Sequence, residues 1–102
     1  MTEDERKIIT YVREVSTAQL VQELSDGKLL GTDLRAIGKL RLYRLPEEVK
    51  NVLLYCAKCK MSKHINYRDV YKIAARWNRL RVQTAEEAFE LAKQEGCFQQ
   101  QK

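Results

Sequence analysis

The sequence predicts an all-α fold, a compact bundle of five or six short helices in one domain. No segment alternates apolar and polar residues over the length of a strand, whereas apolar residues recur at helical spacing along most of the chain. Signals for helix starts recur as well. The 102 residues suffice for one modest hydrophobic core, and a composition of 44% hydrophobic and 32% charged residues is typical of a folded domain.

Side-chain caps mark the start of the first two predicted helices. Thr2 and Glu5 have the spacing of a capping box, and the helix that follows is expected to end near Val15. Ser16 and Gln19 repeat this spacing ahead of a short second helix. We divide the chain into an N-terminal helical extension (1–15), a helical domain (16–96) and a frayed C-terminal tail (97–102).

Two further helices are predicted in the middle of the chain. The third begins at Gly31, with Leu34 and Ile37 as its inward residues. Pro46 suits the first position of the fourth, where its missing N–H would have no partner, and this helix extends to about Met61. We expect an inward face of Val49, Val52, Leu53 and Cys56, and a far side of Lys50, Asn51, Leu54 and Lys58. An apolar Leu54 on the far side indicates either a helix covered on both sides or a contact with another chain, and we favour burial.

The last two helices are predicted between Asn66 and Glu95. Asn66 can cap the first of them, because its side-chain oxygen accepts a hydrogen bond from the first turn. Thr84 and Glu87 form a capping box for the second, and Gly96 supplies a left-handed stop.

The helix after Asn66 has two opposed faces. At about 100° per residue, one face carries Val70, Ile73, Ala74 and Trp77, and the other carries Arg68, Lys72, Arg76 and Arg79. Because Trp77 lies on the apolar side, we expect it to anchor packing rather than to stack on bases. The basic face is either an ordinary solvated surface or a binding site for anions.

Positive charge is concentrated in the middle of the chain. The formal net charge is +5. Residues 1–32 have four basic and six acidic side chains (−2), residues 33–82 have thirteen and four (+9), and residues 83–102 have two and four (−2). A central block of this sign favours a polyanionic partner such as nucleic acid, since neutralised phosphates release their condensed counterions.

No residue pattern favours catalysis, a metal site or a cofactor. Cys56, Cys59 and His64 have most of the spacing of a zinc knuckle, with Asp69 beyond them, but the segment has a helical pattern and no glycine. No glycine-rich phosphate loop and no nucleophile with a base partner stands out. We therefore expect a protein that is not an enzyme and that uses no metal, cofactor or small-molecule substrate.

The sequence also predicts a cytoplasmic protein. No apolar run approaches the roughly 20 residues that span a bilayer, and the first residues lack the apolar core of a signal peptide. An odd number of cysteines suits free thiols in a reducing compartment.

Five segments carry, in this order, a resemblance to a known family: Leu45-Pro46-Glu47-Glu48-Val49, Asn51-Val52-Leu53-Leu54-Tyr55-Cys56, Lys72-Ile73-Ala74 with Trp77, Val82-Gln83-Thr84-Ala85-Glu86-Glu87-Ala88 and Leu91-Ala92-Lys93. They resemble the conserved domain of the DnaD and DnaB replication-initiation proteins of low-GC Gram-positive bacteria and their phages. This DnaB is a helicase-loading protein, not the replicative helicase. The resemblance covers roughly residues 16–95.

The resemblance implies a helical domain that binds DNA, particularly single strands, and that assembles with copies of itself. It also implies a role in primosome assembly with the initiator DnaA and the helicase loader. The family's hallmark of tyrosine, isoleucine and tryptophan at spacings of four is matched here by Ile73 and Trp77, which we take as structural. Asp69 stands at the tyrosine position, flanked by Tyr67 and Tyr71. If the tyrosine contacts DNA in the family, a flanking tyrosine replaces it here or the affinity falls.

Two functions follow. The first is a DNA-binding and assembly domain of a replication-initiation or helicase-loading protein, which contacts mainly single-stranded phosphates without reading sequence. Its candidate DNA-binding residues are Lys63, Tyr67, Arg68, Tyr71, Lys72, Arg76, Arg79 and Arg81. The alternative is a protein-interaction module that binds an acidic surface of a helicase, loader or initiator without touching DNA. Its interface would include Leu54 and the alanine face of residues 84–95.

Overall fold

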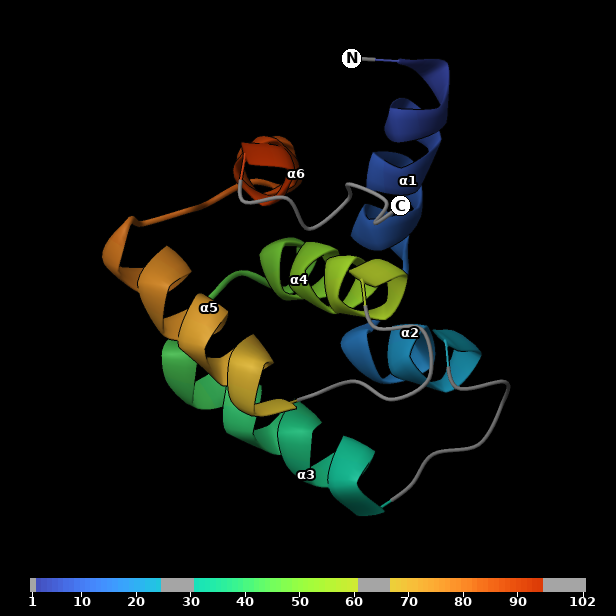
Figure 1. The fold of residues 1–102 in the computed structure, drawn as a ribbon. Helices are drawn as coiled ribbons and strands as arrows, with labels where there is room; N and C mark the ends of the chain where they lie inside the picture. The colour runs from blue at the N-terminus through green and yellow to red at the C-terminus, as the bar shows by residue number, and fades with distance from the viewer. Residues whose placement is uncertain (1, 25–30, 61–66, 95–102) are drawn as a thin grey trace.

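The computed structural model describes residues 2–24, 31–60 and 67–94, and within them the chain forms six α-helices and one turn of 3₁₀-helix (Figure 1). They are α1 (Glu3–Glu14), α2 (Thr17–Leu24), α3 (Gly31–Leu40), the 3₁₀ turn η1 (Arg41–Tyr43), α4 (Glu47–Lys60), α5 (Tyr67–Arg79) and α6 (Ala85–Gln94). These ranges contain no strand, so the predicted all-α fold is confirmed. None of these helices combines the length and apolar character needed to cross a membrane.

The predicted caps of α1 and α2 are present. The Glu5 carboxylate accepts a hydrogen bond from the Thr2 N–H at 2.9 Å, and the Thr2 hydroxyl accepts one from the Glu5 N–H at 3.1 Å. The Ser16 hydroxyl accepts a hydrogen bond from the Gln19 N–H at 3.1 Å. Local side-chain chemistry therefore defines where both helices begin.

The cap of α6 differs in one detail from the prediction. The Thr84 hydroxyl accepts a hydrogen bond from the Glu87 N–H at 3.2 Å, as expected of a capping box. The Glu87 carboxylate, however, accepts from the backbone N–H of Gln83 at 3.4 Å, one residue before the cap. The predicted cap at Asn66 and the predicted stop at Gly96 lie outside the described residues.

Helix α4 is the centre of the bundle. It packs against α1, α2, α5 and α6, and Figure 1 shows it between these elements. Val49, Val52, Leu53 and Cys56 are buried, as predicted. Leu54 on the other side is 0% exposed as well, which confirms its predicted burial. The helix is therefore covered on both sides.

The expected outward position of Asn51 was wrong. Asn51 is 0% exposed. Its amide nitrogen donates to the carbonyl oxygens of Val12 and Val15, each at 2.8 Å, and its amide oxygen accepts from the Thr17 hydroxyl at 2.8 Å. The carbonyls at the end of a helix have no partner within that helix, so a polar side chain on α4 is stabilised beside the end of α1.

The inward face of α3 also differs from the prediction. Leu34 is 56% exposed, whereas Ala36 and Leu40 are buried and Ile37 is half-buried. Because α3 contacts α2, η1 and α5, these neighbours select the face with Ala36 and Leu40, which lies more than a quarter-turn from Leu34.

Helix α4 begins one residue later than predicted. It starts at Glu47, and the Pro46 carbonyl accepts hydrogen bonds from the N–H groups of Val49 and Lys50, both at 3.0 Å. Pro46 therefore occupies the capping position rather than the first helical position, and its ring still displaces no helical hydrogen bond.

Helix α1 shares the core with the rest of the bundle. Ile9, Val12 and Val15 are buried, and α1 packs against α4 and α6. The division of the chain at residue 15 stays a prediction. The alanines of α6 face the same core: Ala85, Ala88 and Ala92 are 0% exposed. The alternative function placed an interface with another protein on Leu54 and these alanines, and the structure places them in the core instead.

Candidate nucleic-acid interface

The two predicted faces of α5 are confirmed in the structure. Val70, Ala74 and Trp77 are 0% exposed, and Ile73 is half-buried. The cations on the opposite side are all exposed, and we call them the basic stripe: Arg68, Lys72, Arg76 and Arg79. At 1.5 Å per residue the stripe extends over about 16 Å of the helix.

Trp77 anchors α5 to the core. It is among the largest fully buried side chains, and its indole N–H has no hydrogen-bond partner among the described residues. A tryptophan in this position cannot stack on a base without leaving the core. The prediction that Trp77 is a packing residue is therefore confirmed.

Three tyrosines fill the seam between α5 and the α3–η1 segment. The ring of Tyr71 is stacked on that of Tyr43 (6.2 Å between centroids, 17° between planes) and on that of Tyr67 (6.2 Å, 25°). The Lys39 ammonium lies 4.3 Å from the Tyr71 centroid, a cation–π contact. Tyr71 thus joins residues of α3, η1 and α5. A role for Tyr67 or Tyr71 in stacking on bases stays a prediction.

The residues around Tyr71 raise the pKa of its hydroxyl. Burial raises the pKa of its hydroxyl, the neighbouring Tyr43 adds to the rise, and the positive charge of Arg35 opposes it. Tyr71 is therefore a neutral, half-buried ring with cations of α3 close by.

The structure adds cations that the predicted site did not include. Arg35 and Lys39 on α3, Arg41 on η1 and Arg44 directly after η1 are exposed, and the sequence has no acidic residue from Leu34 to Pro46. Because α5 packs against α3 and η1, these cations belong to the same half of the molecule as the basic stripe (Figure 1). The basic block of residues 33–82 includes them, but a count of charges along the sequence does not show which helices are neighbours in the fold.

Arg81 ends α5 in a conformation that usually requires glycine. Its φ is 58°, its N–H donates to the Asn78 carbonyl at 3.1 Å, and the Val82 N–H donates to the Trp77 carbonyl at 3.2 Å. This pair of hydrogen bonds is the Schellman motif, in which the left-handed residue is most often glycine. Arg44, which follows η1, has φ 56° and ψ 32°. Both non-glycine residues with positive φ in the described ranges are therefore exposed arginines of the basic half.

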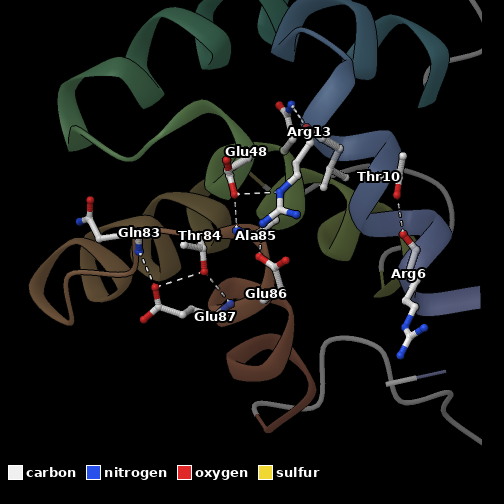
Figure 2. A network of polar contacts seen from close by, with 11 residues as sticks. Arg6, Thr10, Arg13, Glu48, Gln83, Thr84, Ala85, Glu86 and Glu87 are labelled. Atoms are coloured by element: carbon white, nitrogen blue, oxygen red, sulfur yellow. Dashed lines mark hydrogen bonds and ion pairs between the residues drawn. The ribbon is translucent and has the colours of Figure 1, made fainter. Parts of the chain in front are cut away.

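Ion pairs join α1, α4 and α6 on the side of the bundle away from α3 (Figure 1). Arg13 of α1 pairs with Glu48 and with Glu86, and Lys93 of α6 pairs with Glu5 and with Glu90 (Figure 2 shows the contacts of Arg13). On the basic side, Lys72, Arg79 and Arg81 pair with no carboxylate among the described residues. Within the described ranges, Glu5, Glu48, Glu86 and Glu90 are therefore paired with cations, whereas these three cations of the basic side have no carboxylate partner.

Asp69 lies at one edge of the basic stripe. It is exposed, and the helical angle places it next to Arg76 and away from Tyr67 and Tyr71. A carboxylate at this edge repels phosphates that pass directly over it, so the side of the stripe nearer to the tyrosines is the more favourable one for an anion.

Two other predicted features concern the cysteines and the link before α5. Residues 55–60 continue α4, which agrees with the helical pattern that argued against a zinc knuckle, and Cys56 is a buried free thiol. Residues 2–24, 31–60 and 67–94 contain no cluster of three or more His, Cys, Asp or Glu side chains that could hold a metal ion. Lys63 and His64 lie outside these ranges.

No known family model matches the sequence, and no solved structure matches this chain.

Proposed function

We propose that this protein binds DNA, mainly single strands, through the phosphate backbone and without reading sequence. The observation that carries the proposal is the basic stripe, four exposed cations in line on a helix whose opposite face is buried in the core. Lys72 and Arg79 have no carboxylate partner in the part of the chain that the structure describes. Phosphates are the partners that such a row of cations suits best.

The arrangement explains how binding would work. Guanidinium and ammonium groups spaced along about 16 Å of helix can contact several successive phosphates of one strand. The buried Val70, Ala74 and Trp77 fix the backbone of α5 on the bundle, so binding has to order only the side chains of the cations. The site contributes electrostatic affinity and no base recognition.

The sequence resemblance to the DnaD and DnaB proteins supports a role in replication initiation. Under this proposal the domain is cytoplasmic and non-catalytic, assembles with copies of itself, and meets the initiator and the helicase loader of a primosome. The departure at Asp69 is compatible with DNA binding, because the basic stripe has further cations on the side away from this carboxylate.

The decisive experiment measures the fluorescence anisotropy of a labelled single-stranded oligonucleotide, titrated with the protein at several salt concentrations. Replacing Arg76 and Arg79 together by alanine should weaken binding equally for unrelated sequences. It should also lower the slope of log affinity against log salt by about 1.4, or about 0.7 for each lost contact.

A matched control comes from α1. Arg6 and Lys7 are both exposed there, and replacing them by alanine removes the same charge from α1 instead of α5. This control should keep the wild-type salt slope. Equal effects of the two double variants would contradict a defined site on α5, and absence of wild-type binding at low salt would contradict the proposed function.

One observation favours a second function, a module that binds an acidic protein surface. Among the described residues, the exposed large apolar side chains are Leu34 (56%), Leu42 (77%) and Leu80 (55%), and each adjoins an arginine in the sequence. Arginine is enriched at protein interfaces, and exposed apolar side chains beside it can be buried against a partner. Such a module would bind a helicase, loader or initiator but not oligonucleotides, so the same titration separates the two functions.

A further inference from the structure

We propose that the exposed cations of α3 and η1 form a second row beside the basic stripe of α5, which we call the second wall of the DNA-binding surface. We further propose that Leu42 contacts an unstacked base there and so favours single strands over duplexes. This inference rests on the proposed function. It adds residues outside the predicted site, and it assigns the strand preference to a particular side chain.

The second wall has the charge that the proposal needs. Arg35, Lys39, Arg41 and Arg44 are exposed, and no acidic residue occurs from Leu34 to Pro46. A strand that leaves the basic stripe on the side away from Asp69 therefore meets further cations.

Contacts between aromatic rings fix the distance between α5 and the α3–η1 segment. Tyr43 of η1 is stacked on Tyr71 of α5 with centroids 6.2 Å apart, and Lys39 of α3 lies 4.3 Å from the same ring. Helices packed in this way lie about 8–10 Å apart, so one strand can be held by cations of both. The stacked rings of Tyr43 and Tyr71 lie between the cations of the two elements.

Leu42 is the most exposed of the large apolar side chains in the described ranges, at 77%. It is flanked in the sequence by Arg41, which can hold a phosphate, and by Tyr43, which is fixed against α5. Leucine is one of the apolar side chains that proteins insert between adjacent bases, and in a duplex this insertion partly unstacks the base steps. In a duplex this contact requires unstacking of paired bases, whereas a single strand already offers base faces. Leu42 therefore gains more from a single strand.

The backbone conformation of the turn after Leu42 explains why its side chain is exposed. Arg44 has φ 56°, and its N–H donates to the Arg41 carbonyl at 3.2 Å, which closes a tight turn around Leu42 and Tyr43. Residues other than glycine rarely adopt this conformation. The turn directs the chain into α4 while Leu42 stays at the surface.

The test compares an oligothymidine with a mixed-sequence duplex of the same length, both labelled, by anisotropy at several salt concentrations. Leu42→Ser should weaken binding of the single strand by about fivefold and leave the duplex within about twofold. Arg35→Ala with Arg41→Ala should lower the salt slope for the single strand by about 1.4. Because the three side chains are exposed, the midpoints of urea unfolding should stay at the wild-type value, and Leu42→Ala provides a second variant.

The outcomes separate this inference from the function on which it rests. If the Arg76 and Arg79 variant loses affinity while the α3–η1 variants bind like the wild type, the second wall is wrong and the proposed function stands. Equal weakening of single strand and duplex by Leu42→Ser would overturn the strand preference assigned to Leu42. If the wild type binds neither ligand, both proposals are wrong.

Discussion

Glu48 accepts a hydrogen bond from the backbone N–H of Ala85, with 2.6 Å between the carboxylate oxygen and the nitrogen (Figure 2). The same oxygen lies 3.3 Å from Nε of Arg13. One carboxylate in the first turn of α4 therefore holds the start of α6 and a side chain of α1. The neighbouring Glu47 accepts from the Thr17 N–H at 3.0 Å and so caps α2. The acidic pair after Pro46 thus joins three helices to the central one.

Glu48→Ala should destabilise the protein by about 1–2 kcal/mol, because the first N–H of α6 loses its charged acceptor. Glu48→Gln keeps an acceptor oxygen without the charge and should fall between the alanine variant and the wild type. Urea unfolding followed by circular dichroism measures both. Glu90→Ala is the control, since Glu90 pairs only at the surface with Lys93, and it should stay within about 0.5 kcal/mol of the wild type.

Asn51→Leu should destabilise the protein by about 3 kcal/mol. The leucine fits the volume but cannot donate to the Val12 and Val15 carbonyls, which remain buried without a partner. Urea unfolding gives the loss of stability, and amide hydrogen exchange should show faster opening at the junction of α1 and α2. An unfolding free energy within 1 kcal/mol of the wild type would mean that these hydrogen bonds contribute little.

Arg81→Gly should raise stability and lower DNA affinity at the same time. Glycine adopts a φ of 58° without strain, which is expected to add about 1 kcal/mol, while the lost cation weakens phosphate binding. Thermal unfolding and the anisotropy titration measure the two effects.

Gly38→Ala is the matched control for this variant. Gly38 is exposed within α3, and an added Cβ would meet no atom within 4 Å. Alanine should therefore stabilise the helix by about 0.5–1 kcal/mol. DNA affinity should not change, so a loss of affinity in Gly38→Ala equal to that in Arg81→Gly would show that stabilisation, not charge, reduces binding.

Tyr11 should make stability depend on alkaline pH. Burial raises the pKa of its hydroxyl to about 12, and the hydrogen bond to the Glu23 carboxylate contributes to the rise. The ordinary pKa of tyrosine is 10.0, so between pH 10 and pH 12 the folded protein keeps a proton that the unfolded chain releases. The stability due to neutral Tyr11 is therefore complete below pH 10 and is lost as the pH rises towards 12. Urea unfolding from pH 8 to pH 12 should show a smaller alkaline decline for Tyr11→Phe than for the wild type.

Local signals predicted the helices well but the orientation of some side chains poorly. The caps at Thr2, Ser16 and Thr84 depend on residues within three positions of each other, so they are visible in the sequence. Asn51 and Leu34 were misplaced because burial depends on which helices cover a face, and periodicity cannot reveal this. A polar residue reads as exposed unless its distant partners are known.

The candidate site was predicted only in part, because the sequence shows local patterns but not which helices are neighbours. The basic stripe and the buried face of α5 follow from a single helical period, and the structure agrees with both. The left-handed turn at Arg81, which follows the end of α5 at Arg79, was not predicted, since the Schellman motif there has no glycine to signal it. The cations of α3 and η1 were counted but could not be assigned to the same surface.

Patterns in the sequence were enough to predict that this chain is all-α, where most of its helices begin, and that one helix presents cations opposite an apolar face. These properties arise from interactions within a few residues, through caps and a period of 3.6. The folded structure was needed to show that Glu47, Glu48 and Asn51 hold helices together, and that α3 lies beside α5 and enlarges the basic half. Such contacts join residues tens of positions apart, and they form only because all the helices must bury their apolar faces around α4 at once.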